Sequence, residues 1–421
     1  MKPPGSKPTS PCGQQPMWID TDRAFQEFCQ QAHTRTELAI DLEFQGEGRY
    51  TPLLCLVQLG LRDRCVAVDP FRVNLTPLGP LLTHPGIRKI VHAGGQDIVL
   101  LRRETDAIPV SVFDTQIAAA FLGYGEATGY ATLAQRFARV SLSKRQQFTD
   151  WTRRPLLPEQ IEYALNDVRY LFPVYDGLLE QLAQHGRTDW VLDACADAVA
   201  QAVKGRDTGQ EYLKIGKLGS MSRRELAVLR ELCQWREATA RSRNRPVGTI
   251  LHDDVLRQIA YTLPRTETAL RQMRGTNNLS RELVMEILET IQQALALPES
   301  EWPEPVTVRE YDPTLDGLAT LLGAIVRLRA GTLDIAPNLL ATRDDLLRFA
   351  GWVLRGRPAA EAGQLAVLQG WRQAVIGDLL IDLVSGKSLL QIAPEAPGAL
   401  RIIPPAPSTP ADGQPDPGDT A

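Results

Sequence analysis

The stretch Ala39–Phe44, with the sequence AIDLEF, places two carboxylates inside what otherwise has the pattern of a buried β-strand. In an extended strand, residues two apart point to the same face, so Asp41 and Glu43 share one side and Leu42 points to the other. Two like charges held so close raise each other's pKa unless a cation lies between them, and divalent metals are the usual cation. The pair therefore predicts a metal site with further ligands elsewhere; a solvated strand end is the alternative for this stretch alone.

The segments around this stretch predict a mixed β-sheet covered by helices on both faces. Apolar runs at 53–59 and 64–68 follow it with only the turn-forming segment Gly60–Asp63 between them, so the sheet is expected to begin antiparallel. The other predicted elements are a short strand or helix entry at 18–21, a helix at 22–32 capped by Asp20 or Thr21, a strand at 88–92, a helix at 97–104, and helices at 116–122, 131–137 and 161–175, the last disturbed by Pro173. Beyond residue 219 the pattern is helical, and no strand is expected before the C-terminus.

Two further aspartates follow a predicted strand or lie on a predicted helix, where they can point into the same cleft. Asp97 comes after the strand at 88–92, in the first turn of a helix, where capping of that helix is the alternative role. Asp167 lies four residues after Tyr163, a spacing that places both side chains on one helical face. Beside a metal site the phenol can hydrogen-bond a water molecule and orient it, whereas simple packing is its alternative role.

These four carboxylates, on a mixed sheet beside a basic segment, indicate a two-metal phosphodiesterase site. Oxygen ligands favour Mg²⁺ or Mn²⁺ over Zn²⁺, which prefers histidine or cysteine ligands. The five histidines form no ligand pair at helical spacing. We therefore expect two divalent ions, Mg²⁺ or Mn²⁺, as the cofactors.

A basic segment with aromatic residues points to nucleic acid. Residues 136–154 hold six basic side chains against one acidic one, and residues 204–245 hold 11 against 5. Cationic loops with aromatic rings suit a single strand, because charges contact phosphates and rings stack on bases; a solvated charge run is the alternative. The side chains that we expect to contact nucleic acid are Lys144, Arg145, Trp151, Arg230, Arg236 and Arg245.

The composition is that of a globular protein with two or three domains. The 421 residues are 43% apolar and 23% charged, with a net charge of -4, which does not fit general disorder or membrane insertion. No apolar run is long enough for a spanning helix, so no membrane partner is expected. The N-terminal 15 residues have no apolar core typical of a signal peptide. The six cysteines lack the spacing of a disulfide framework, which predicts a reducing, cytoplasmic location.

Two glycine-containing segments resemble nucleotide-binding motifs only in part. Ser385–Ser388 ends like a P-loop, but the upstream glycine that the motif needs would fall at Ile381. Gly94–Gly95 does not form a dinucleotide fingerprint. We therefore expect no nucleotide cofactor.

Three motifs together resemble those of the DEDD exonucleases in order and approximate separation: Asp41–Glu43, His92–Asp97 and Tyr163–Asp167. The tyrosine is typical of the DEDDy type. Additional stretches are similar to the ribonuclease D family: Leu56–Leu59, Phe113–Gln116, Lys144–Trp151 and Asp167–Leu171. Leu42 stands where members of the family often have threonine, and its side chain is expected to face away from the site.

The C-terminal half resembles the helical modules of the same family. Leu229–Arg236 and Arg245–Pro246 look like an HRDC domain, the nucleic-acid-binding module shared with RecQ helicases, and Leu339–Arg343 and Gly370–Arg372 look like a second, divergent copy. Composition predicts a disordered N-terminus (1–16), linkers at 204–216 and 298–313, and a disordered Pro-rich tail (393–421). The resemblance implies an α/β ribonuclease H-like exonuclease domain with a mixed sheet flanked by helices (17–203), an HRDC domain (217–297) and a second all-α HRDC-like domain (314–392).

The resemblance also implies a function. The expected enzyme is a monomeric 3′-to-5′ exoribonuclease that hydrolyses 3′-terminal phosphodiesters, releases nucleoside 5′-monophosphates and matures tRNA precursors and other small structured RNAs. Asp41, Glu43, Asp97 and Asp167 would bind the two metal ions, and Tyr163 would orient the attacking water. A DNA 3′-to-5′ exonuclease is one alternative. A non-catalytic nucleic-acid-binding protein is another, although it would be expected to lack a metal carboxylate, and none is missing.

Overall fold

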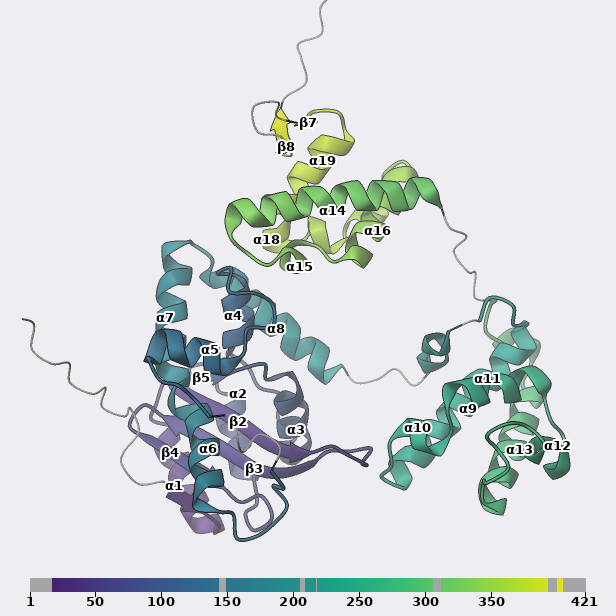
Figure 1. The fold of residues 1–421 in the computed structure, drawn as a ribbon, viewed down its shortest axis with the longest axis horizontal. Helices are drawn as coiled ribbons and strands as arrows, with labels where there is room; N and C mark the ends of the chain where they lie inside the picture. The colour runs from purple at the N-terminus through teal and green to yellow at the C-terminus, as the bar shows by residue number, and fades with distance from the viewer. Residues whose placement is uncertain are drawn as a thin grey trace, which may run out of the picture. The chain divides into compact units, whose positions relative to one another are not determined.

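The computed structural model describes residues 17–143, 149–204, 209–216, 218–305, 312–392 and 400–403 (Figure 1). Their contacts divide the chain into two compact units. Unit 1 holds the described residues within Met1–Ala119 and Ala127–Glu310, and unit 2 those within Ala120–Glu126 and Tyr311–Ala421. The segment 120–126 thus packs with the C-terminal part of the chain.

A six-stranded mixed sheet forms the centre of unit 1. Its strands lie in the order β1 (Met17–Ile19), β4 (Arg64–Val68), β3 (Leu53–Leu61), β2 (Glu37–Gln45), β5 (Arg88–Val91) and β6 (Val112–Asp114). The pairs β2–β3 and β3–β4 are antiparallel, whereas β1–β4, β2–β5 and β5–β6 are parallel. The predicted mixed sheet with an antiparallel beginning is therefore confirmed, and β2 lies inside it, between β3 and β5.

The hairpin β3–β4 is tighter than predicted, because β3 continues to Leu61 and only two residues form the turn. On its other side, β3 pairs with β2 so that Gln58 lies opposite Asp41. The register shifts after Glu43, where Cys55 of β3 has no partner on β2. This β-bulge lies where β2 carries its second carboxylate, a common position for bulges near active sites.

The two faces of the sheet are covered by different helices. Leu38, Ile40 and Leu42 point into a hydrophobic core that also contains Phe25 of α1 and Leu101 of α3. Leu42 thus faces away from the site, as predicted. The helices of this part are α1 (Asp22–Ala32), α2 (Gly79–Thr83), α3 (Gly95–Thr105), α4 (Thr115–Ala120), α5 (Tyr130–Leu133) with the π-turn η2 (Ala134–Ala138), α6 (Pro158–Arg169), α7 (Leu171–Gln184) and α8 (Thr188–Val203).

Helix α6 packs on the other face, against β2, β3 and β4. Its buried side chains Ala164, Leu165 and Val168 lie on the sheet side. The sequence predicts one helix at 161–175, but the structure has two, because the backbone turns at Tyr170 (φ -100°, ψ 5°) between α6 and α7. Pro173 falls in the first turn of α7, where its missing N–H costs no helical hydrogen bond.

The predicted cap of α1 is present: the Thr21 hydroxyl accepts a hydrogen bond from the backbone N–H of Ala24.

The cysteines differ in part from expectation. Cys29, Cys55, Cys195 and Cys233 are free, but Cys65 is disulfide-bonded. Disulfides depend on distance in the fold, which the spacing of cysteines along the chain does not reveal.

An all-helical bundle completes unit 1. Its elements are η3 (Glu211–Ile215), α9 (Arg223–Ser242), α10 (Val247–Ile250), α11 (Asp253–Thr262), α12 (Glu267–Arg271), α13 (Arg281–Ala296) and η4 (Glu299–Glu301). Leu229 and Leu232 of α9 lie in its core, together with Tyr212 and Ile215 of η3. Part of the predicted linker 204–216 therefore packs with the helical bundle.

Unit 2 is mainly helical, with α14 (Pro313–Leu333), α15 (Pro337–Leu340), α16 (Arg343–Leu354), α17 (Ala359–Ala362), η5 (Ala366–Leu368), α18 (Gly370–Arg372), η6 (Gln373–Gly377) and α19 (Asp378–Val384). The prediction of no strand after residue 219 was wrong. Strands β7 (Leu389–Ile392) and β8 (Leu400–Ile403) form an antiparallel pair, and β8 falls inside the predicted disordered tail. Short strands of this kind are stabilised by a partner strand, which a local sequence pattern does not show. Among the described residues, no helix is long and apolar enough to cross a membrane.

Candidate active site

Three of the predicted metal ligands converge between β2 and α6. Asp41 and Glu43 leave β2 on the same face, and Asp167 comes from α6, which packs on that face. One carboxylate oxygen from each of the three residues lies within 4.8 Å of the others. Ligands from a strand and a helix that are distant in sequence therefore form one compact oxygen cluster.

Asp97 comes from the first turn of α3 and is buried beside this cluster. The charge of Asp41 contributes to raising the pKa of Asp97, which indicates that the two carboxyl groups lie near each other. Asp97 is not one of the three residues within 4.8 Å of one another. The structure thus brings all four predicted carboxylates into one region, with three of them in closest contact.

The loop before α3 is shaped by a residue that sequence reasoning did not assign. Asp114 at the end of β6 accepts hydrogen bonds from the backbone N–H groups of Ala93 and Gly94, at 3.0 and 2.9 Å. Ala93 has a positive φ of 54°, and a Cβ on Gly94 would lie 2.7 Å from a methyl group of Val91. Asp114 and this glycine therefore fix the turn that aims Asp97. The Phe113–Gln116 similarity was the available signal, but it gave no role to Asp114.

His92 has a structural environment. Its Nδ1 lies 2.9 Å from the Thr115 hydroxyl, and its ring packs against Tyr130 at 5.6 Å between centroids. Tyr130 was also missed by sequence reasoning. Its hydroxyl donates to the backbone carbonyl of Asn166 at 2.8 Å, so it links α5 to the turn of α6 that carries Asp167.

Burial raises the pKa of every carboxyl group in the cluster. The pKa of Asp41 rises to about 7 through burial, although a backbone hydrogen bond from Leu42 opposes the change. The pKa of Glu43 rises to about 9 through burial, with the charges of Asp41, Asp167 and Asp97 adding to it. Burial also raises the pKa of Asp97 and Asp167 well above the usual range. A cluster whose ionised form is this unfavourable is suited to a divalent cation, and its ligands are all hard oxygens.

Tyr163 lies one helical turn before Asp167 on α6. Burial raises its pKa, and the charges of Asp167, Glu43 and Asp41 raise it further, so the phenol keeps its proton. Its ring faces that of Trp151, with centroids 6.2 Å apart and planes tilted by 37°. A cavity of about 520 Å³ lies beside it, lined by Leu142, Ser143, Pro158, Glu159, Glu162, Tyr163, Asn166 and Asp167. The phenol is thus between an aromatic wall and a cavity large enough for a small ligand.

The residues predicted to contact nucleic acid have varied environments. Lys144 and Arg145 lie outside the described residues. Trp151 is only 5% exposed, so it is a packed wall and not an open stacking surface. Arg236 is 8% exposed and donates to the Leu251 carbonyl and to Asp253, at 2.7 Å each. Their contacts with RNA stay predictions.

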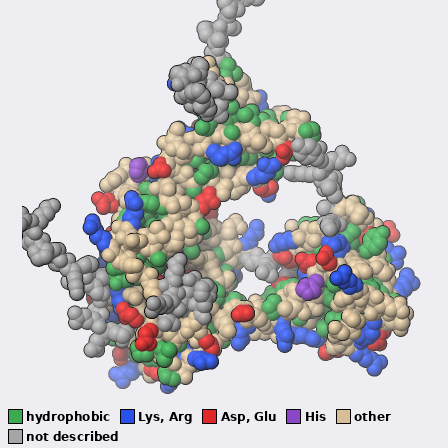
Figure 2. All heavy atoms as spheres, in the orientation of Figure 1, with side chains coloured by type: hydrophobic (Ala, Val, Ile, Leu, Met, Phe, Trp, Pro, Cys, Tyr) green, Lys and Arg blue, Asp and Glu red, His purple; other side chains and the backbone are tan. Residues whose placement is uncertain are grey.

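The two remaining arginines of that set are more accessible. Arg230 donates to Glu231 at 2.9 Å and to the carbonyl of Glu301. Arg245 is exposed. On the face of the molecule drawn in Figure 2, basic and acidic side chains are interspersed. Contacts of these arginines with RNA likewise stay predictions.

Comparisons with known proteins identify the family of the chain. Residues 16–183 match the 3′-5′ exonuclease family, and residues 225–291 match the HRDC domain. The chain is 33% identical to ribonuclease D of Acidiphilium cryptum over 385 residues, covering 90% of this chain and 96% of the relative. It is 34% identical to ribonuclease D of Sphingobium indicum, covering 88% and 94% of the two chains.

A solved structure extends the similarity to the whole fold. The crystal structure of Escherichia coli RNase D, an exoribonuclease involved in structured RNA processing, superposes with a TM-score of 0.79 at 26% identity. The match covers 88% of this chain and 99% of that one. With this similarity over nearly the full length of its relatives, the chain belongs to the ribonuclease D family of 3′-to-5′ exoribonucleases.

Proposed function

We propose that Asp41, Glu43, Asp97 and Asp167 bind two divalent cations, Mg²⁺ or Mn²⁺, and that this site removes nucleotides one at a time from RNA 3′ ends. The observation that supports it most directly is the convergence of Asp41, Glu43 and Asp167 within 4.8 Å. The all-oxygen ligand set favours these two ions over softer metals. The products are nucleoside 5′-monophosphates.

The bound cations would stabilise the charge that develops on the phosphate during an in-line displacement. The protein's side chains would bind the cations, orient the attacking water and position the ligands. The four carboxylates of β2, α3 and α6 would hold the cations, and their burial would limit screening by bulk water. The Tyr163 phenol, which keeps its proton, hydrogen-bonds the attacking water and directs it at the phosphorus. Asp114 keeps Asp97 aimed at the site through the loop at Ala93 and Gly94.

We assign the 3′ trailers of tRNA precursors and other small structured RNAs as substrates. The similarity to E. coli RNase D, an exoribonuclease involved in structured RNA processing, supports this choice. The HRDC domain would bind the folded body of the RNA through phosphate contacts, which position a substrate without reading its sequence. The basic side chains Lys144, Arg145, Arg230, Arg236 and Arg245 are the proposed contacts. The protein acts as a monomer in the cytoplasm.

The test compares a 3′-extended tRNA precursor with single-stranded DNA of equal overhang, in Mg²⁺ and in EDTA. The expected result is stepwise shortening of the RNA 3′ end to 5′-monophosphates in Mg²⁺ only. Asp41→Asn should abolish turnover but leave RNA binding measurable. Asp176→Asn is the matched control, because Asp176 is half exposed and pairs with Arg62. Full activity of Asp41→Asn would refute the site, and faster cleavage of DNA would refute the substrate class.

A further inference from the structure

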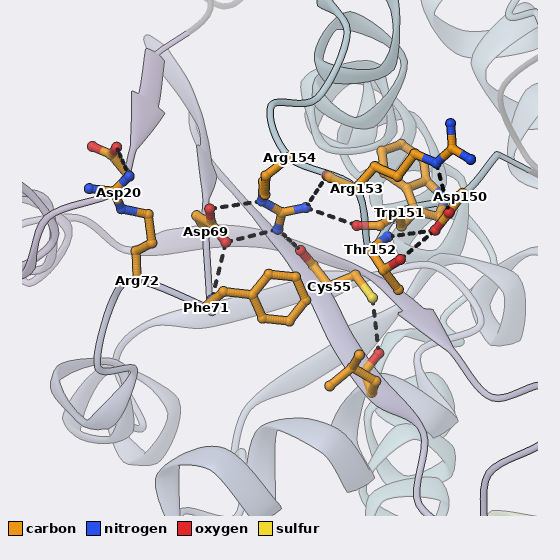
Figure 3. Close-up of polar contacts among 11 residues, drawn as sticks. Asp20, Cys55, Asp69, Phe71, Arg72, Asp150, Trp151, Thr152, Arg153 and Arg154 are labelled. Atoms are coloured by element: carbon orange, nitrogen blue, oxygen red, sulfur yellow. Dashed lines mark hydrogen bonds and ion pairs between the residues drawn. The ribbon is translucent and has the colours of Figure 1, made fainter.

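One arginine anchors the loop that carries Trp151. Arg154 holds both carboxylate oxygens of Asp69 at the end of β4, with Nε and Nη2 each at 2.8 Å (Figure 3). Nη2 also donates to the backbone carbonyl of Cys55 in β3 at 2.6 Å. Two strands of the sheet thus hold one guanidinium, and the loop is tied to the sheet through it.

The anchor is enclosed on several sides. The Asp69 side chain is 1% exposed, and that of Arg154 is 22% exposed. The guanidinium lies over the ring of Phe71 at 4.5 Å and over that of Trp18 at 5.8 Å. A bidentate pair that is stacked on aromatic rings has a fixed geometry, which lysine cannot reproduce.

Arg154 also contacts the backbone of Trp151. Nη1 of Arg154 donates to the backbone carbonyl of Trp151 at 2.9 Å (Figure 3), and Gln160 of α6 donates to Thr149 at the start of the same loop, also at 2.9 Å. The Trp151 ring is thereby held 6.2 Å from the Tyr163 ring. Among the described residues, the hydrogen bonds of Arg154 go to Asp69 and to backbone carbonyls, and its link to Tyr163 runs through Trp151.

We propose that Arg154 is a positioning residue for the reaction, which fixes the Trp151 ring as the wall that holds Tyr163 in place for its water. This inference rests on the proposed role of Tyr163. Asp69 and the Cys55 carbonyl complete the anchor. The competing interpretation is that the ion pair only stabilises the fold, in which case its loss lowers stability without a specific effect through Tyr163.

Arg154→Lys is the primary test, because lysine keeps a cation opposite the buried Asp69 and avoids an unpaired charge there. Lysine cannot hold the two carboxylate oxygens of Asp69 and the three backbone carbonyls, of Cys55, Trp151 and Arg153, at once. We expect kcat on a 3′-extended RNA to fall about tenfold to a hundredfold, as for a small misplacement of a reacting group, while KM changes little. The matched control is Arg72→Lys, since Arg72 forms an exposed pair with Asp20 and should keep full kcat.

Combination with Tyr163→Phe separates the two interpretations. If Arg154 acts through Tyr163, the double variant Arg154→Lys with Tyr163→Phe should be no slower than Tyr163→Phe alone. Equal loss of kcat in both backgrounds would overturn the inference while the proposed function stands. If Tyr163→Phe itself retains full kcat, the role of Tyr163 fails first, and the inference with it.

A second variant keeps the test valid if the lysine enzyme folds poorly. Trp151→Leu leaves the Arg154–Asp69 pair intact and removes only the aromatic wall. It should lower kcat by a similar factor and should also have no further effect in the Tyr163→Phe background. Unchanged kcat for Trp151→Leu in a folded protein would overturn the inference.

Discussion

Replacing Asp41 by asparagine should stabilise the metal-free protein at pH 8, although it removes a metal ligand. Burial raises the pKa of Asp41 from 3.8 to about 7 in the folded protein. A group with a raised folded pKa favours folding below its unfolded pKa, and this contribution is lost as the pH rises through the folded pKa. At pH 8 the wild type therefore has to keep an unfavourable buried carboxylate.

The magnitude follows from the pKa change. One pKa unit corresponds to about 1.4 kcal/mol, so a change of roughly three units sets an upper limit of about 4 kcal/mol at pH 8. Asp41 is partly accessible to water, which reduces this value to roughly 2 kcal/mol. Asparagine keeps an oxygen that can accept the hydrogen bond from Leu42, so no backbone donor is left unpaired.

The assay is urea unfolding in EDTA at pH 8 and at pH 4, for wild type, Asp41→Asn and the control Asp176→Asn. The Asp41 variant should be more stable by about 2 kcal/mol at pH 8 and nearly equal to wild type at pH 4. Added Mg²⁺ should stabilise the wild type more than the variant. The reasoning is refuted if the metal-free variant is no more stable at pH 8, or if its advantage does not depend on pH.

Three substitutions outside the cluster test two buried side chains, Lys89 and Gln58, and one glycine with a positive φ, Gly123. Burial lowers the pKa of Lys89 from 10.5 to about 8 in the folded protein. Because the unfolded chain then binds more protons between these two values, the free energy of unfolding should rise with pH from about 8 to 10.5. Lys89→Met should remove this rise, as measured by urea unfolding. Gln58 is fully buried, and among the described residues its side chain has no hydrogen-bond partner. Gln58→Met should therefore raise the free energy of unfolding by about 1 kcal/mol. A lower free energy of unfolding would contradict this. Gly123 has a φ of 73°, and a Cβ there would overlap the Asp334 carboxylate. Gly123→Ala should therefore lower the free energy of unfolding by about 1 kcal/mol or more and speed limited proteolysis at 120–126. The control Gly129→Ala should do neither.

The parts of the fold that the sequence could predict depend on short-range chemistry. The alternation at Asp41 and Glu43 is a property of any extended strand, and the capping of α1 by Thr21 needs only three following residues. The pairing of Tyr163 with Asp167 depends on one helical turn. Such features appear in the structure where the pattern places them.

The parts that could not be predicted depend on contacts between distant segments. Asp114 acts on Ala93 and Gly94, which are 21 and 20 residues away, and Arg154 binds Asp69 across 85 residues. The burial of Trp151, which the basic segment had suggested as an open stacking surface, is another such case. Local patterns give the residue types for these roles but not the partners.

The bulge between β2 and β3 links the carboxylate strand to the loop anchor. Cys55 has no partner on β2, and its carbonyl accepts a hydrogen bond from Arg154. Deleting Cys55 would restore regular strand pairing but would remove this acceptor. The length of β3 at the bulge is therefore constrained by the hydrogen bond to Arg154. Variation in loop length should be tolerated in the turn Arg62–Asp63, and poorly tolerated at Cys55.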